Sequence, residues 1–198
     1  MEGQVNGCLA LRQPGSSIKP FLYALALESG IPVSSILPDT ALEFKLADGT
    51  IFAPRNFGNN YHGPTRVREA LSSSFNIPTV YLLDRIGVSR FYGFLRDLDF
   101  TSLNKNAAFY GLSLGLGAGD VTLMEMVNAY RTIARGGVKS APRFVLATEP
   151  PSEASAFGVH KDRAIFTRPT AYIITDILGD NASRIKAFGE DSPMNLPF

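Results

Sequence analysis

A serine and a lysine, Ser16 and Lys19, stand three positions apart just ahead of a strongly apolar run. Three residues are nearly one helical turn, so a helix that opens at Ser16 places the lysine amine within reach of the serine hydroxyl. Burial disfavours the ammonium form, and a desolvated lysine can act as a base near neutral pH. A serine beside such a base can attack a carbonyl carbon, and the helix N-terminus adds positive potential near the oxyanion that forms. The pair therefore indicates acyl-transfer chemistry.

The residues that follow Ser16 and Lys19 decide whether the pair indicates a catalytic site or an ordinary helix start. On its own, Ser-x-x-Lys is more typical of a helix cap followed by a solvated lysine. Residues 21–27 are apolar on all sides, however, which is typical of a helix buried within a core. A lysine at the start of a buried helix is rare without a partner or a function. The context favours a catalytic role for Lys19.

A second polar group of residues, Ser74-Phe75-Asn76, ends a helix-like run further along the chain. Alone it is typical of a polar helix terminus, because Ser and Asn favour helix ends and turns. Together with the first pair it has a chemical use. The hydroxyl of Ser74 can relay a proton between a lysine amine and a leaving nitrogen, and the amide of Asn76 can hold a substrate amide in register.

Composition narrows the class of protein. The 198 residues are 45% hydrophobic and 19% charged with a net charge of +1, as in one soluble globular domain. Lys and Arg are scattered, so nucleic acid is not an expected partner. No apolar stretch approaches the roughly 20 residues that span a bilayer, and no signal-peptide pattern opens the sequence. Cys8 is the only cysteine, so no disulfide is expected. The two histidines, His62 and His160, are isolated in the sequence, so no metal site is expected either, and no cofactor is predicted.

Hydrophobic periodicity predicts an α-rich structure with little sheet. Alternating apolar residues on either side of Ala47-Asp48-Gly49 predict a β-hairpin over residues 42–52. Short strands are also expected near residues 143–147 and 164–166. One helix is expected to begin at Ser16 and a second near Thr65. A third is expected to have Ser89 as its cap, and a fourth to begin at a capping box formed by Thr122 and Glu125. A fifth is expected over residues 171–178.

The order of these motifs resembles the penicillin-binding transpeptidases, whose three signatures are Ser-x-x-Lys, Ser-x-Asn and Lys-Thr/Ser-Gly. The likeness extends to residues 12–21, 63–71 and 74–80, in the pattern of the class A bifunctional enzymes of peptidoglycan synthesis, and most of all their 1C subgroup. It runs over essentially the whole sequence. The implied fold class is α+β, the penicilloyl-serine transferase (β-lactamase/transpeptidase-like) fold. We expect the α-rich helical lobe of this fold, with most of its central antiparallel sheet missing.

The resemblance implies a role for each motif residue. Ser16 matches the acylated nucleophile, Lys19 its base, Ser74 the proton relay and Asn76 the substrate-orienting amide. The family's reaction is attack on the D-Ala-D-Ala bond of a peptidoglycan stem peptide and transfer of the acyl group to an amine of a neighbouring stem. β-Lactams mimic this substrate and trap the serine. The expected ligands are therefore stem peptides and β-lactams, with no cofactor and no metal.

The third signature does not occur. The nearest match, Lys139-Ser140-Ala141, lacks the glycine, and we interpret Lys139 as a surface lysine. In the family this signature supplies a lysine for the substrate carboxylate and an oxyanion-hole N–H, and losing one such donor costs about 10²–10³ in rate. We therefore expect residues 1–198 to be one incomplete transpeptidase domain, without glycosyltransferase domain or membrane anchor, and inactive by itself. Its parent is expected at the periplasmic face of the bacterial inner membrane.

Two other functions stay open. A serine β-lactamase or β-lactam sensor needs a group that activates a deacylating water, and Glu69 is the carboxylate nearest to the Ser-x-Asn motif. Its match to a helical segment of the family that the sequence resembles implies a structural role instead. The remaining alternative is a non-catalytic scaffold in which both motifs are relics.

Overall fold

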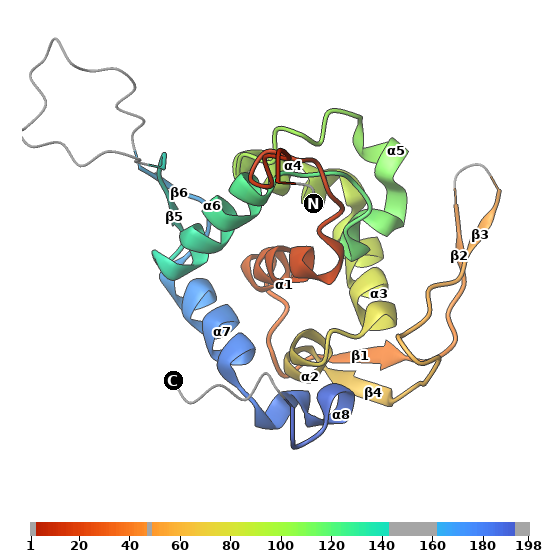
Figure 1. The fold of residues 1–198 in the computed structure, drawn as a ribbon. Coiled ribbons are helices and arrows are strands. Elements are labelled where there is room, and N and C mark those ends of the chain that lie inside the picture. The colour runs from red at the N-terminus through yellow and green to blue at the C-terminus, as the bar shows by residue number, and fades with distance from the viewer. Residues whose placement is uncertain (1–2, 47–48, 143–161, 193–198) are drawn as a thin grey trace, which may run out of the picture.

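The computed structural model describes residues 3–46, 49–142 and 162–192, in which short helices and strands surround one central helix (Figure 1). The α-helices are α1 (Lys19–Glu28), α2 (Val67–Ser72), α3 (Asn76–Ile86), α4 (Val88–Asp97), α5 (Ala107–Tyr110), α6 (Leu123–Ala134), α7 (Arg168–Gly179) and α8 (Ile185–Phe188). The 3₁₀ helices within the described residues are η1 (Gly15–Ile18), η2 (Gly111–Leu116) and η4 (Ala182–Arg184). The strands are β1 (Ile36–Asp39), β2 (Phe44–Lys45), β3 (Ile51–Phe52), β4 (Gly63–Arg66), β5 (Val138–Lys139) and β6 (Arg163–Ala164).

Helix α1 forms the centre of the core. All of its residues from Lys19 through Ala26 are buried, so the helix has no solvent face over this stretch. It contacts α2, α3, α4 and α7, which enclose it as Figure 1 shows. Each fully buried large apolar side chain contributes roughly 1.5–3 kcal/mol to this core. The prediction of a buried helix behind Lys19 is confirmed.

Helix α6 has the predicted capping box. The hydroxyl of Thr122 accepts from the backbone N–H of Glu125, and the Glu125 carboxylate accepts from the backbone N–H of Thr122. The chain then turns at Gly136 and Gly137, both with positive φ. At Gly137 a Cβ atom would lie 2.0 Å from the carbonyl oxygen of Phe166, so only glycine fits there. This close approach brings the start of α7 against the end of α6.

The strands of the described residues form three two-stranded antiparallel sheets. The predicted hairpin is present as β2 and β3, with Phe44 opposite Phe52. Strand β6 lies at the start of the strand expected near residues 164–166, whereas the strand expected near 143–147 lies outside the described residues. The sequence did not predict the pairing of β1 with β4, in which Asp39 lies opposite Gly63. This pairing matters most for the site.

Two local expectations were wrong. Thr65 belongs to strand β4, and α2 begins after Arg66. Ser89 lies inside α4, whose N-cap is Gly87. Lys139, interpreted as a surface lysine, forms a solvent-exposed ion pair with Asp99 at 2.6 Å.

Across these same described ranges, the helices are too short or too polar for any of them to span a bilayer. No three His, Cys, Asp or Glu side chains among them gather as metal ligands would.

Candidate active site

Lys19 is 1% exposed and lies beneath the loop that joins α2 to α3. Its Nζ donates to the carbonyl oxygen of Ser74 at 2.6 Å and to Oδ1 of Asn76 at 2.7 Å. The Ser74 hydroxyl lies 3.2 Å away, and the carbonyl oxygen of Phe75 lies 3.3 Å away. An ammonium group has three hydrogens, so these four oxygens are more than enough to satisfy it.

The burial of Lys19 sets its protonation. Desolvation disfavours the charged form and lowers the pKa of Lys19 from its ordinary 10.5 to about 7. The surrounding oxygens accept from the ammonium group and act in the opposite direction, but burial is the larger effect. At neutral pH the side chain is therefore divided between its acid and base forms, which suits a group that takes a proton and later returns it.

The loop between α2 and α3 gives Ser74 its position. Its φ of 56° lies in the left-handed region, which is uncommon for a residue other than glycine. In this conformation both the carbonyl oxygen and the hydroxyl of Ser74 reach Lys19. Asn76 begins α3, and its Nδ2 donates to the carbonyl oxygen of Arg55 at 2.8 Å while Oδ1 accepts from Lys19. The structure thus brings together three of the four predicted site residues.

Ser16 lies in η1 and is exposed. It lines a pocket of about 460 Å³ together with Ser74 and Asn76. One expectation about it was wrong: the α-helix begins at Lys19, and Ser16 lies in the 3₁₀ helix before it. Among the described residues no hydrogen bond joins the Ser16 hydroxyl to Lys19, because Ser74 and Asn76 supply the acceptors that the buried ammonium needs, whereas the exposed serine hydroxyl can be solvated.

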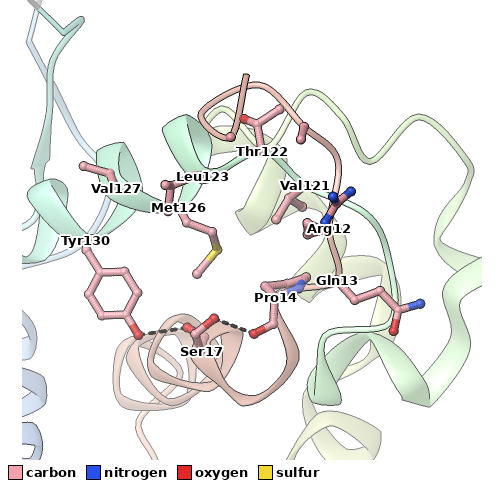
Figure 2. Close-up of a pocket in the computed structure, with 12 residues that line it drawn as sticks. Arg12, Gln13, Pro14, Ser17, Val121, Thr122, Leu123, Met126, Val127 and Tyr130 are labelled. Atoms are coloured by element: carbon pink, nitrogen blue, oxygen red, sulfur yellow. Dashed lines mark hydrogen bonds between the residues drawn. The ribbon is translucent and has the colours of Figure 1, made fainter. Parts of the chain in front are cut away.

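The turn that carries Ser16 is held by two contacts. Gly117, at the end of η2, packs so closely against Gly15 that a Cβ atom at Gly117 would lie 2.3 Å from the Gly15 carbonyl oxygen. From the other direction, the Tyr130 hydroxyl of α6 donates to the carbonyl oxygen of Ser17 at 2.9 Å (Figure 2). These contacts fix the backbone on both sides of the nucleophile candidate.

Figure 2 shows a second cavity, of about 570 Å³, between residues 7–17 and α6. Its lining is mostly apolar and includes Pro14, Val121, Met126 and Tyr130. Ser17 faces this cavity, but none of the four predicted site residues lines it. It is therefore distinct from the pocket that contains Ser16.

Glu69, the carboxylate considered for activating a deacylating water, is not among the residues that line the Ser16 pocket. Its Oε2 pairs with Lys186 Nζ at 3.2 Å. Lys186 itself lines the pocket from α8, so the pair lies at the rim. This arrangement is consistent with the structural role that the sequence favoured for Glu69.

Comparison with known proteins decides the family. Residues 6–187 match the penicillin binding protein transpeptidase domain. The chain belongs to the penicillin-binding protein transpeptidase family. Penicillin-binding protein 1C of Escherichia coli K12 is 34% identical over 181 residues, which are 91% of this chain and 22% of that protein. This transpeptidase chain therefore spans about a fifth of the length of that relative.

Solved structures confirm the fold. Penicillin-binding protein 1A from Haemophilus influenzae matches with a TM-score of 0.75 at 25% identity, over 90% of this chain and 31% of that one. Penicillin-binding protein A from M. tuberculosis, solved as an imipenem acyl-enzyme complex, matches with a TM-score of 0.69 at 21% identity, over 92% of this chain and 46% of that one. The predicted α-rich part of a transpeptidase fold is thereby confirmed, as is the resemblance to class A penicillin-binding proteins.

Three polar residues at the Ser16 pocket escaped the sequence-based prediction: Asp39, and Asn56 and His62, which line the pocket. Asp39 is fully buried at the end of β1 and accepts from Asn56 Nδ2 at 2.7 Å and from the His62 backbone N–H at 2.9 Å. The Oδ1 of Asn56 in turn accepts from the Asn76 backbone N–H at 2.8 Å. No local pattern signals this group, because the pairing of β1 with β4 brings His62 to Asp39 and a side-chain hydrogen bond joins Asn56 to Asp39.

Proposed function

We propose that this chain carries the acylating site of a peptidoglycan D,D-transpeptidase, with Ser16 as nucleophile, Lys19 as base, Ser74 as proton relay and Asn76 as the substrate-orienting amide. The observation that carries the proposal is the buried lysine of lowered pKa, which is held by Ser74 and Asn76 and opens α1 directly after the 3₁₀ helix that contains the exposed serine. Each group has the state that its role requires: a neutral amine is a base, and an exposed hydroxyl can meet a substrate.

The reaction is an acyl transfer in two steps. Ser16 Oγ attacks the carbonyl carbon of the penultimate D-Ala, and its proton passes to the neutral amine of Lys19. The tetrahedral intermediate collapses as the C–N bond breaks, and the leaving D-Ala nitrogen receives a proton from Lys19 through the Ser74 hydroxyl. An amine of a second stem peptide then attacks the acyl-serine, and Ser16 regains its proton as the new amide forms. No oxidant, metal or cofactor is needed to balance these steps.

Asn76 has the hydrogen-bonding capacity for its proposed role. Its Oδ1 accepts from Lys19 and one Nδ2 hydrogen is donated to Arg55. The second Nδ2 hydrogen is left for a carbonyl oxygen of the substrate peptide or of a β-lactam side chain. We infer that the same residue thus links the base to the acyl donor.

The ligands follow from the family and from one relative. We infer that stem peptides ending in D-Ala-D-Ala are substrates and that β-lactams acylate Ser16, supported by the acyl-enzyme that imipenem forms with penicillin-binding protein A of M. tuberculosis. We also infer that the site works at the periplasmic face of the inner membrane as part of a longer enzyme, supported by the likeness to penicillin-binding protein 1C of E. coli. A β-lactamase function receives no comparable support, because Glu69 is paired with Lys186.

Labelling with a fluorescent penicillin tests the proposal. The expected result is a stable adduct that peptide mass mapping assigns to Ser16, present in the unaltered chain and absent in Ser16→Ala. Ser17→Ala is the matched control, because Ser17 is also exposed, lies next in the chain and lines the other cavity, and it should label normally. An adduct that hydrolyses within seconds would indicate a β-lactamase instead. No adduct at all, or one on another residue, would overturn the assignment of Ser16.

A further inference from the structure

We propose that Asp39, Asn56 and His62 form a positioning network that holds the Ser74–Asn76 loop against Lys19. The inference rests on the proposed function in one respect only, namely that the loop it positions is the one that serves the catalytic lysine. Asn56 and His62 line the Ser16 pocket, Asp39 is fully buried, and the resemblance to transpeptidases assigns these residues no role. Its members come from three separate segments: the end of β1, the loop after β3 and the residue before β4.

The first step of the argument concerns the start of α3. The N-cap residue of this helix, Phe75, offers no side-chain cap to the free N–H groups of the first turn. Asn56 supplies the missing acceptor from outside the helix: its Oδ1 accepts from the backbone N–H of Asn76 at 2.8 Å and of Ile77 at 3.3 Å. A cap of this kind typically contributes about 1 kcal/mol and fixes where the helix begins. Here it fixes the residue whose side chain contacts Lys19.

The second step concerns the orientation of the Asn56 amide. Its Nδ2 donates to Asp39 Oδ1 at 2.7 Å and to the carbonyl oxygen of Asn60 at 2.9 Å. Both of these partners are acceptors, so the amide cannot rotate by half a turn without facing oxygen with oxygen. Asn56 is 6% exposed and Asp39 is fully buried, so an unpaired group at either position is costly. Asp39 therefore keeps Asn56 Oδ1 directed at α3.

The third step concerns His62. Its Nδ1 lies 2.7 Å from Asp39 Oδ2, which already accepts from the His62 backbone N–H. A carboxylate oxygen accepts, so Nδ1 carries the proton. The ring stacks on Phe75 at a centroid distance of 4.1 Å and an interplanar angle of 14°. Phe75 lies between Ser74 and Asn76, and its carbonyl oxygen faces Lys19, so His62 supports the middle of the loop.

The network and Lys19 are thus joined through Asn76 and Phe75. If the network is lost, the loop is free to move, its oxygens leave Lys19, and water enters. Hydration favours the ammonium form, so the pKa of the lysine should rise. The titratable groups near it are Asp39, His62 and Tyr23, with the Lys186–Glu69 pair at the pocket rim. In the described residues none of these makes a hydrogen bond or ion pair with Lys19. An uncharged substitution at Asn56 therefore isolates the positional effect.

The test is a direct titration of Lys19 by ¹³C NMR in lysine-labelled protein, in the unaltered chain and in Asn56→Ala. The expected result is an upward shift in the pKa of Lys19 of about one unit or more, from loss of the loop and entry of water. Asn128→Ala is the matched control, because it removes another buried amide, in α6, that bonds none of these residues. Leu98→Ala, in the buried core, controls for lost stability. Neither control should move the lysine titration.

Two His62 variants provide a second test of the network, which applies even if Asn56→Ala does not fold. His62→Ala removes both the ring stack and the bond to Asp39, and should raise the pKa of Lys19. His62→Phe keeps the stack and should raise it less. A Lys19 titration that is the same in all of these variants as in the unaltered chain overturns the network. The titration of Lys19 needs no penicillin, so its outcome is independent of whether Ser16 is labelled. A pKa that does not shift overturns the network even if Ser16 is labelled. A pKa that shifts supports the network even if Ser16 is not labelled.

Discussion

The protonation of the Lys19 side chain is subject to two opposing effects. Burial favours the neutral amine, whereas the oxygens of Ser74, Phe75 and Asn76 favour the ammonium form. Burial is the larger effect and lowers the pKa of Lys19 to about 7. A folded protein that keeps a lysine in this state loses stability for it, which is the usual trade-off at a catalytic position.

This trade-off predicts a pH dependence of stability. The pKa of Lys19 is about 7 in the folded chain against an ordinary 10.5, so between these values the unfolded chain binds more protons. The free energy of unfolding should therefore rise with pH across this window, by at most about 1.4 kcal/mol per pH unit. Below the window the slope should vanish and the destabilising effect of the buried ammonium should be complete, and above the window that effect should be gone. Lys19→Met should remove this slope in urea unfolding, whereas Lys105→Met, at an exposed position, should keep it. Parallel curves for the unaltered chain and Lys19→Met would contradict the pKa.

The backbone of Ser74 predicts a separation of stability from activity. Its φ of 56° costs a non-glycine residue about 1 kcal/mol, so Ser74→Gly should relieve strain and leave stability equal or higher. Loss of the relay hydroxyl should lower the rate of Ser16 acylation by about 10²-fold or more. Asn59→Gly, at φ 58°, makes the same backbone change without touching the site and should acylate normally. A Ser74→Gly variant of unchanged acylation rate would remove the relay from the account.

At the scale of elements, we expect the contact between η2 and η1 to position the proposed nucleophile, Ser16. Gly117→Ala places a Cβ atom about where the Gly15 backbone lies, so the turn that carries Ser16 must move. We expect this variant to lose Ser16 labelling and to unfold at lower urea concentration. Gly93→Ala is the matched control: it lies exposed inside α4 with open space around it, and should raise stability by about 1 kcal/mol. Equal labelling of the two variants would show that the contact does not position Ser16.

The same scale explains what the sequence could predict. The buried helix behind Lys19, the capping box at Thr122 and the hairpin over residues 42–52 are local patterns, and all three are present. The meeting of Lys19 with Ser74 and Asn76 followed from two motifs and a family resemblance. Asn56 and Asp39 could not be found this way, because a capping side chain supplied from a distant loop leaves no periodicity and no spacing in the sequence.

At the scale of the whole molecule, the proposed site has two of the family's three signatures, and neither Lys-Thr-Gly nor Lys-Ser-Gly occurs in the sequence. The nearest candidate is Lys139, which is paired with Asp99 and does not line the Ser16 pocket. In the family, the third signature supplies a cation for the substrate carboxylate and an oxyanion donor, and one such donor alone is worth about 10²–10³ in rate.

We therefore expect the 198-residue chain to cross-link stem peptides at a rate at least about 10²-fold below that of a full-length class A enzyme assayed beside it. Mass spectrometry of cross-linked products measures this directly. Penicillin acylation of Ser16 should persist at a reduced rate, because strained β-lactams need less help than a peptide bond. Cross-linking at a rate comparable to the full-length enzyme would mean that other residues of this chain replace the third signature.

The most direct test of the central claim, that Lys19 is the base for Ser16, is the pH dependence of Ser16 acylation by a labelled penicillin. The rate should rise with pH through a single step with a midpoint at the Lys19 pKa of about 7, and Lys19→Met should lose both the step and most of the rate. A rate that is flat from about pH 5 to pH 9, or a step that survives in Lys19→Met, would contradict the account.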